Sequence, residues 1–380
     1  MVKILINTIS TKKIAGGAYQ IAQNFLLKSL EHREIDWYYI VSQDIDDAIG
    51  ANFESIKGTK YFAFPTQPDF RKTYRKVKKE LIRLENEIKP DLVYSITSPS
   101  YFRFKTPEVM RFTNPWVTHP NKYAWSTLSF LEKIVYFLYG ILQKRMMKTS
   151  SYFITQTETC KKGIMRITAL PSDNIAVVNN VLPDIYSRVD NTPIRADNGI
   201  INVAAVGNTS PHKNFDIIPD VIKQLEILGY SNLCFHTTFP EDDLVTKKIL
   251  DKAKKMHVEG KICNHGRLSQ LELSEMYRMC QFCFLPTLLE VFSASTIEAM
   301  FFNLPIVATD FPFNSEVLGD SCLYYEPKNP QSAAKQFAKM IGNIELQNMF
   351  KEKMKKRLSL YGDYDNHFTQ IESFLLQVAK

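Results

Sequence analysis

The sequence predicts an α/β protein built from two Rossmann-like domains, each with a parallel sheet covered by helices. Short apolar strands alternate with amphipathic helices along most of the chain. The alternation stops over residues 181–199, which combine Pro, Asp, Asn and Gly without periodicity, and then restarts. The length of 380 residues is roughly two to three times that of a single domain. We therefore predict an N-terminal domain over 1–185, a C-terminal domain over 186–363, and a final helix over 364–380 that packs back on the N-terminal domain.

The elements follow from the pattern of apolar residues. The first strand is expected over 3–9, and a polar loop with Gly16 and Gly17 leads from it to a helix over about 18–30. Further strands are expected at 37–41, 91–96, 108–113, 152–157 and 174–179, and the longest helix at 129–148. The second half has strands at 200–206, 233–238, 281–286, 304–310 and 322–326, and a helix over about 214–228. Ligands of such sheets bind beyond the carboxyl ends of the strands, so the chemistry is expected in a cleft between the halves.

Composition excludes several classes of protein. Hydrophobic residues make up 45% and charged residues 23%, which is typical of a folded globular chain and not of a disordered or collagenous one. The six cysteines are scattered among apolar residues, which favours a reducing, cytoplasmic compartment. The longest apolar stretch, residues 134–142, is too short to span a bilayer, and the N-terminus does not resemble a secretory signal.

The net charge of +7 is concentrated in the first half, where residues 1–190 hold 27 Lys and Arg against 18 Asp and Glu. Residues 71–89 contribute eight basic and three acidic side chains to an amphipathic helix whose apolar side includes Leu81 and Leu84. One interpretation is a solvated helix face. The other is attraction to an anionic acceptor or to an anionic membrane surface, which would place the protein peripherally on the inner face of the cytoplasmic membrane. Nucleic acid is not expected, because neither aromatic interleaving nor a known binding motif is present.

The most informative segment is LPTLLEVFSASTIEAMFFNLPIVATD, residues 285–310. Glu290 follows a buried strand, and Glu298 comes eight residues later, about one turn into a helix. The amides near Ser293 and Ala294 form the N-terminus of that helix, which favours anions. Two alternatives stay open: Ser295 and Glu298 have the spacing of a capping box, and Glu290 has the position of an ordinary loop carboxylate.

These residues resemble the group 1 glycosyltransferases (glycosyltransferase family 4). The hallmark of the family is two glutamates separated by seven residues, then Ala-Met and a Leu-Pro-Ile-Val strand, which here begin at Glu290 and end at Val307. The segment AVGNTSPHKNF is similar to the family's phosphate-binding loop, with Lys213 at the position of its lysine. Gly266 with Arg267, and the early Gly16-Gly17 loop, are further matches in the family's order.

The resemblance implies a GT-B fold, with two Rossmann-like domains facing each other across a cleft, and a nucleotide-diphosphate sugar as donor. Glu298 would hold the ribose hydroxyls, and Glu290 would face hydroxyls of the donor sugar. Lys213, the amides near Ser293 and Ala294, and the Gly16-Gly17 loop would take the diphosphate. It also implies retention of configuration, no metal and no other cofactor, and a saccharide or lipid-linked saccharide acceptor at the N-terminal domain. The remaining donor-binding positions implied by the family are Gly207, Asn208, Gly266, Arg267 and Phe292.

The sequence departs from the family at three places. Asn208 stands where the family usually has Arg, so one positive charge near the diphosphate is missing. Val291 and Ser293 stand where the family commonly has glycine, which restricts the backbone conformations open to this loop. The family's acceptor-side histidine has no certain match: His119 is the catalytic candidate, although a histidine beside proline is more often structural, and Asn114 is its rival for positioning a hydroxyl.

The predicted function is therefore sugar transfer from a nucleotide-sugar to a hydroxyl acceptor, in surface, capsular or lipopolysaccharide synthesis. Two alternatives stay open: a non-catalytic nucleotide-sugar-binding partner subunit, suggested by Asn208, and a sugar-nucleotide epimerase on the same fold. The pairs Asp44/Asp46 and Asp363/Asp365 are too short a motif to indicate a metal. Cys280 and Cys283 are expected to be packing residues, because no second pair completes a metal site.

Overall fold

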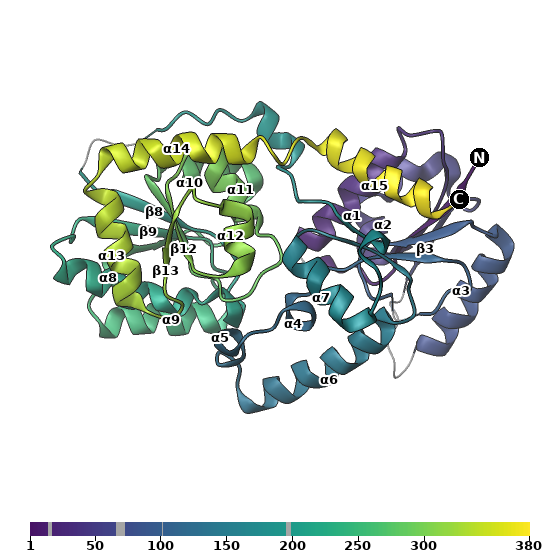
Figure 1. Ribbon diagram of the computed structural model, residues 1–380, viewed down its shortest axis with the longest axis horizontal. Coiled ribbons are helices and arrows are strands. Elements are labelled where there is room, and N and C mark those ends of the chain that lie inside the picture. Colours follow the sequence, from purple (N-terminus) through teal and green to yellow (C-terminus); the bar gives the residue numbers. More distant parts are fainter. Residues whose placement is uncertain (14–16, 66–72, 101, 195–198) are drawn as a thin grey trace. The chain divides into compact units, whose positions relative to one another are not determined.

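The computed structural model describes residues 1–13, 17–65, 73–100, 102–194 and 199–380 (Figure 1). The chain divides into two compact units. The first comprises residues 1–119, 136–179 and 365–380, and the second comprises residues 120–135 and 180–364. Residues 120–135 and 180–185, which the sequence analysis placed in the N-terminal domain, thus cluster with the second unit.

In its described residues, the first unit has a seven-stranded parallel sheet with the order β3-β2-β1-β4-β5-β6-β7. Its strands are β1 (Lys3–Thr8), β2 (Asp36–Ser42), β3 (Tyr61–Phe64), β4 (Leu92–Ser95), β5 (Glu108–Arg111), β6 (Tyr152–Thr155) and β7 (Ile175–Val177). The helices of this unit include α1 (Gly17–Ser29), α2 (Gln43–Ile49), α3 (Tyr74–Ile88), α4 (Pro115–Thr118), α7 (Glu158–Thr168) and α15 (Tyr364–Val378). Helix α6 (Phe130–Met147) begins in the second unit and ends in the first.

The sheet of the first unit is buried on both faces, as parallel sheets are. Ile4 and Ile6 of β1 point into a cluster that includes residues of α1 and α15, whereas Leu5 points into a second cluster with α3. Phe368 of α15 stacks on Phe25 of α1 with 4.7 Å between ring centroids. Burying one such aromatic side chain contributes about 2 kcal/mol, so the last helix is held to this unit by its own core.

In its described residues, the second unit has a six-stranded parallel sheet with the order β10-β9-β8-β11-β12-β13. The strands are β8 (Ile201–Ala205), β9 (Leu233–Thr237), β10 (Ile262–Asn264), β11 (Phe282–Leu285), β12 (Ile306–Thr309) and β13 (Leu323–Tyr325). The helices include α5 (Lys122–Trp125), α8 (Ile218–Ile227), α9 (Leu244–Lys255), α10 (Gln270–Met279), α11 (Ala294–Phe301), α12 (Pro312–Leu318), α13 (Pro330–Ile341) and α14 (Ile344–Leu358).

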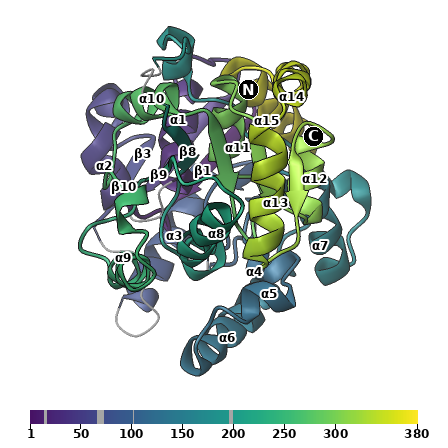
Figure 2. The same cartoon turned by 90° about the vertical axis from the view of Figure 1, so that its left-hand side faces the viewer.

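Alternate residues of the central strand β11 define the two faces of the second sheet. Phe282 and Phe284 join a cluster with α8, α9 and α13, whereas Cys283 joins a cluster with α10 and α11. Helices α8 and α13 pack side by side (Figure 2). The strand order reverses between β8 and β11, and the loops after these two strands therefore emerge together at the carboxyl edge of the sheet, where doubly wound folds bind ligands.

The edge strands β3 and β10 were not expected, and two further segments differ from the expected elements. The helix expected from residue 214 begins with a short 3-10 turn, η6 (Phe215–Ile217), because Asn214 adopts a left-handed conformation with φ 58°. Residues 181–199, expected to be a plain linker, contain the 3-10 turn η4 (Asp184–Arg188), whose Tyr186 is buried in the core of the second unit. A single turn with few apolar residues has no periodicity for a sequence pattern to show.

Candidate functional site

Two loops meet at the switch point of the second sheet, one after β8 and one after β11. The backbone N–H of Leu288 donates to the His212 carbonyl at 2.7 Å, and the Asn214 side chain donates to the Pro286 carbonyl at 3.2 Å. Gly207 begins the first loop, and a Cβ there would lie 3.0 Å from the ring of Phe215, so only glycine fits without displacing that ring. The loops therefore hold each other in place.

The central feature of the site is the ion pair between Lys213 and Glu290, one residue from each loop. Both side chains are mostly buried, with exposed fractions of 16% and 18%. Burial favours the neutral acid, but Lys213, His212 and the Val291 backbone N–H favour the carboxylate more strongly and lower the pKa of Glu290. The pair thus presents a cation and an anion together at the carboxyl edge of the sheet.

His212 lies beside this pair and was not singled out by the sequence analysis. Burial, together with the charge of Lys213, lowers the pKa of His212 to about 4, although Glu290 acts in the opposite direction. Its imidazole is therefore neutral at pH 7. Its position directly before Lys213, in the loop that resembles a phosphate-binding loop, is the signal that could have found it.

Glu298 is buried within α11 and is held by two tyrosines. Tyr277 donates to its carboxylate at 2.9 Å and Tyr186 at 3.2 Å. Burial raises the pKa of Glu298, although both hydroxyls favour its charged form. The capping-box alternative is wrong, because the residue before the helix is Ser293 and the Glu298 carboxylate contacts tyrosines. Neither tyrosine was predicted as part of the site.

The N-terminus of α11 lies between Glu290 and Glu298 in the chain. Ser293 makes no capping hydrogen bond through its side chain, and its hydroxyl instead lies 2.8 Å from that of Ser295. The amides near Ser293 and Ala294 therefore have no side-chain cap from that residue. Phe292, predicted to contact the donor, is buried in the core against the ring of Tyr361.

The other positions predicted to bind the donor lie in loops of the second unit. The Asn208 side-chain oxygen Oδ1 accepts from the Ser210 backbone N–H at 3.0 Å, so this side chain shapes its own loop. Gly266 has φ +70°, a conformation that favours glycine, and Arg267 beside it is exposed. The segment from the first half of the chain also contributes: Asn121 donates to the Leu288 carbonyl at 2.7 Å.

The residues predicted for the acceptor belong to the first unit. Asn114 is the N-cap of α4: its side chain accepts from the Trp116 N–H at 3.1 Å and donates to Gln143 at 2.8 Å. His119 ends the same helix, with Nδ1 2.8 Å from the Thr118 hydroxyl. Gly17 begins α1, and Gly16 lies outside the described residues.

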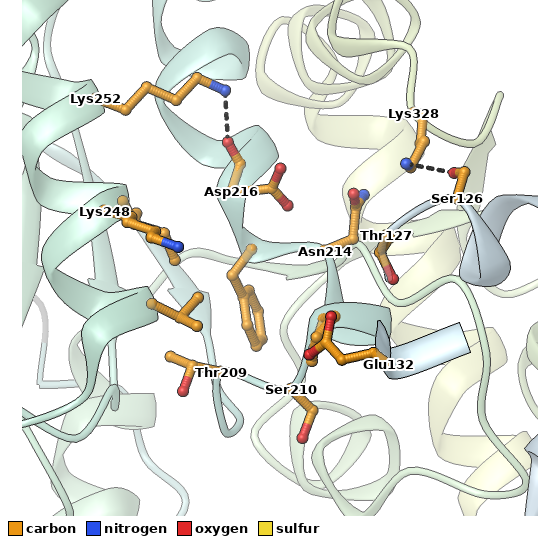
Figure 3. A pocket seen from close by; sticks show the side chains of 14 residues that line it. Ser126, Thr127, Glu132, Thr209, Ser210, Asn214, Asp216, Lys248, Lys252 and Lys328 are labelled. Carbon is orange, nitrogen blue, oxygen red and sulfur yellow. Dashed lines mark hydrogen bonds between the residues drawn. The ribbon is translucent and has the colours of Figure 1, made fainter. Parts of the chain in front are cut away.

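A pocket of about 500 Å³ opens next to the loop after β8 (Figure 3). Thr209 and Ser210 line one part of it, and residues of α9, including Lys248 and Lys252, line another. Lys328 donates to Ser126 at 2.7 Å at its rim. Lys213, Glu290 and Glu298 are not among the described residues that line it, although Pro211 and Asn214, which lie on either side of Lys213 in the chain, are.

Residues 193–357 match the family described as glycosyl transferases group 1. The matched segment lies within the second unit and covers less than half of the chain. Over 225 residues the chain is 29% identical to the O-antigen chain mannosyltransferase RfbU of Salmonella typhimurium, an alignment that covers 57% of this chain and 56% of RfbU. The chain thus matches just over half the length of that relative.

Solved structures extend the likeness from the matched segment to the fold of the whole chain. Anabaena HepE in complex with UDP and glucose superposes with a TM-score of 0.72 at 13% identity, over 99% of this chain and all of HepE. The lipopolysaccharide outer core galactosyltransferase WaaB superposes with a TM-score of 0.65 at 14% identity, over 99% of both chains. The prediction of a GT-B α/β fold is confirmed, and the match over residues 193–357 supports the predicted family.

Proposed function

We propose that the protein is a glycosyltransferase that moves a sugar from a nucleotide-diphosphate donor to a hydroxyl acceptor. The observation that carries this proposal is the pairing of Lys213 with Glu290 where the loops after β8 and β11 meet. A lysine and an acidic residue at the switch point supply what the donor needs: a cation for the diphosphate and an acceptor of hydrogen bonds for the sugar hydroxyls.

The proposed chemistry follows from the charges that develop when the bond between sugar and phosphate breaks. The sugar becomes oxocarbenium-like and the leaving diphosphate gains negative charge. Lys213 and the amides near Ser293 and Ala294 stabilise that charge, each charge-assisted bond contributing about 1.5–3 kcal/mol. With these donors in place we infer transfer without a metal and with retention of configuration. Added Mg²⁺ or Mn²⁺ should not raise the rate, and NMR of the product should show the anomer of the donor.

Glu298 is proposed to contact the ribose of the donor. Each carboxylate oxygen accepts one tyrosine hydroxyl and keeps a further lone pair for a ribose hydroxyl. Replacing Glu298 by Gln should therefore weaken binding of the whole nucleotide, whereas replacing Glu290 by Gln should weaken binding of the sugar-nucleotide more than that of the free nucleoside diphosphate. Calorimetric titration with both ligands separates the two roles, and equal losses in both variants would contradict them.

The substrate class is proposed from the relatives. RfbU is described as an O-antigen chain mannosyltransferase, WaaB as a lipopolysaccharide galactosyltransferase, and HepE was solved with UDP and glucose. We infer that this protein elongates a saccharide or lipid-linked saccharide of a surface polysaccharide or lipopolysaccharide, on the cytoplasmic side of the membrane. His119 and Asn114 are proposed to lie on the acceptor side.

The donor is identified by thermal unfolding of the full chain with UDP-, GDP-, ADP- and dTDP-sugars. A ligand at 100 times its dissociation constant stabilises a fold by about 2.7 kcal/mol, so one nucleotide should stand out. Donor and acceptor together should then yield product, and Glu290→Ala should lose most of the transfer rate. Conversion of the donor without acceptor would instead indicate an epimerase, and binding without transfer a non-catalytic subunit.

We also propose that the protein docks on an anionic membrane surface. Within the described residues, no helix combines the length and the apolar character needed to cross a bilayer. Helix α6, however, has basic residues near its C-terminus and exposes large apolar side chains along its length. These exposed residues are Phe130, Leu131, Ile134, Val135, Phe137, Leu138, Tyr139 and Ile141. Helix α3 adds exposed Lys76 and Lys79. Apolar side chains that enter the interface, next to lysines that bind anionic headgroups, are typical of interfacial helices.

Sedimentation with vesicles tests this docking. Binding to vesicles with anionic lipid should exceed binding to neutral ones and should fall with salt. Phe137→Ser with Leu138→Ser on α6 should reduce binding at all salt concentrations, whereas Lys76→Gln with Lys79→Gln should reduce only the part that depends on salt. Equal binding to neutral and anionic vesicles would contradict the proposal.

A further inference from the structure

Three metal-ligating side chains converge on one face of the outer strands of the second sheet. His236 lies on β9, Cys263 on the edge strand β10, and His265 directly after β10. The parallel register pairs His236 with Cys263, and His265 follows Cys263 by two residues, so all three side chains leave the same face. One ligand atom from each lies within 4.8 Å of the other two.

The hydrogen bonds of His236 indicate which of its two ring nitrogens carries the proton and which has a free lone pair. The Asn202 side-chain oxygen lies 3.0 Å from His236 Nε2, and an amide oxygen only accepts, so Nε2 carries the proton. The neutral ring then has its lone pair on Nδ1, which lies 2.9 Å from His265 Nε2. The Nδ1 lone pair of His236 therefore faces His265, and Nδ1 is the atom through which this ring would bind a metal ion.

We propose that His236 Nδ1, His265 Nε2 and Cys263 Sγ bind one zinc ion, with water in the fourth position. Two imidazoles and a thiolate are ligands that zinc prefers, at about 2.0–2.1 Å for nitrogen and 2.3 Å for sulfur. Tetrahedral coordination at those lengths separates two nitrogens by about 3.3 Å, so the 2.9 Å between His236 and His265 needs only a small opening. Cys263 is exposed, and its face of the cluster is open to the entering ion.

Proton balance is simple in this proposal. With the proton of His236 on Nε2, the hydrogen atom between the rings belongs to His265 Nε2, since His236 Nδ1 is the acceptor. On binding, that hydrogen moves to His265 Nδ1 by a change of tautomer, the Cys263 thiol releases one proton to solvent, and the zinc ion takes the two lone pairs and the thiolate. No oxidant or reductant is involved.

The site has a consequence for the neighbouring loop. His265 is followed directly by Gly266 and Arg267, two residues proposed to contact the donor. A metal bound to His236 and His265 would tie the start of that loop to β9. The proposed site shares no residue with the Lys213–Glu290 pair, so it does not depend on the proposed transferase activity.

Cobalt titration tests the site, with Co²⁺ as the probe of a tetrahedral thiolate position. The full chain, stripped with a chelator, should bind one equivalent of Co²⁺ with a thiolate-to-cobalt charge-transfer band and release it to Zn²⁺. Cys263→Ser should abolish the band and weaken Zn²⁺ binding at least 100-fold, and His265→Asn should weaken it similarly. Cys234→Ser is the matched control, because Cys234 is two residues before His236 on β9 but outside the ligand group.

A second pair of variants tests the role of Asn202 as a positioning residue. Asn202→Ala should weaken Zn²⁺ binding about tenfold, and Asn202→Asp should retain it, because a carboxylate also accepts from His236 Nε2. Circular dichroism without metal shows whether each variant is folded. The proposal is overturned if folded wild-type protein gives no stoichiometric charge-transfer band, or if Cys234→Ser loses as much affinity as Cys263→Ser.

Discussion

A buried carboxylate should make the stability of the first unit depend strongly on pH. Glu108 begins β5 and accepts hydrogen bonds from the hydroxyls of Ser95 and Ser100. Burial raises its pKa from 4.5 to about 7; the two serine bonds oppose the shift and the charge of Glu85 adds to it. The folded state thus holds a proton that the unfolded chain releases. Below pH 4.5, Glu108 is protonated in both states and does not lower the free energy of unfolding. As the pH rises from 4.5 to about 7, the free energy of unfolding falls, and above about 7 the loss is constant.

The size of the effect follows from the shift. A pKa difference of about 2.5 at 1.36 kcal/mol per unit corresponds to about 3 kcal/mol. Glu108→Gln removes the ionisation and keeps an oxygen for the serines, so the free energy of unfolding of the variant relative to wild type should rise by about that amount between pH 4.5 and pH 8. Amide hydrogen exchange of β4 and β5 measures it. Glu87→Gln on exposed α3 is the control and should show little change. A difference that is flat with pH, or that falls as pH rises, would refute the reasoning.

Two further predictions concern packing. Tyr277→Phe leaves one oxygen of buried Glu298 without its donor, and urea unfolding of the second unit should show a loss of about 1–3 kcal/mol; an unchanged midpoint would contradict the bond. Gly163→Ala places a Cβ 2.4 Å from the Thr118 carbonyl oxygen, so the melting temperature of this variant should fall. In Gly140→Ala, no atom lies within 4 Å of the new Cβ, so this variant should stabilise its helix by about 0.5–1 kcal/mol. Equal effects in the two glycine variants would contradict the packing.

The parallel sheets could be predicted because the central strands are short apolar runs buried on both faces, and the helices between them have an apolar stripe. The edge strands β3 and β10 are more exposed, and β10 also lacks such a run; neither was predicted. Lys213 and Glu290 could be predicted as site residues only because their motifs occur in the same order as in the family that they resemble. They lie 77 residues apart, and nothing in their local sequence shows that they meet. The strand order places them together, because β8 and β11 are neighbours although β9 and β10 lie between them in sequence.

The rest of the site depends on contacts that have no local pattern. Tyr186 comes from a segment without periodicity, yet its hydroxyl reaches Glu298 over 112 residues of chain. The apolar character of α6 was visible in the sequence, but only the structure shows that so many of its apolar residues are exposed. The histidines at 236 and 265 are far apart in sequence, and the pairing of β9 with β10 brings them together.

The most direct test of the central claim is calorimetric titration of the preferred nucleotide-sugar into wild type, Lys213→Met and Lys261→Met. Lys261 pairs with Glu226 in the same unit at a similar exposure, 21% and 22%, so it controls for the loss of an ion pair. If Lys213 grips the diphosphate, its removal should weaken binding by about 1.5–3 kcal/mol, roughly 10- to 150-fold, while Lys261→Met binds like wild type. Equal affinity in all three proteins would contradict the account.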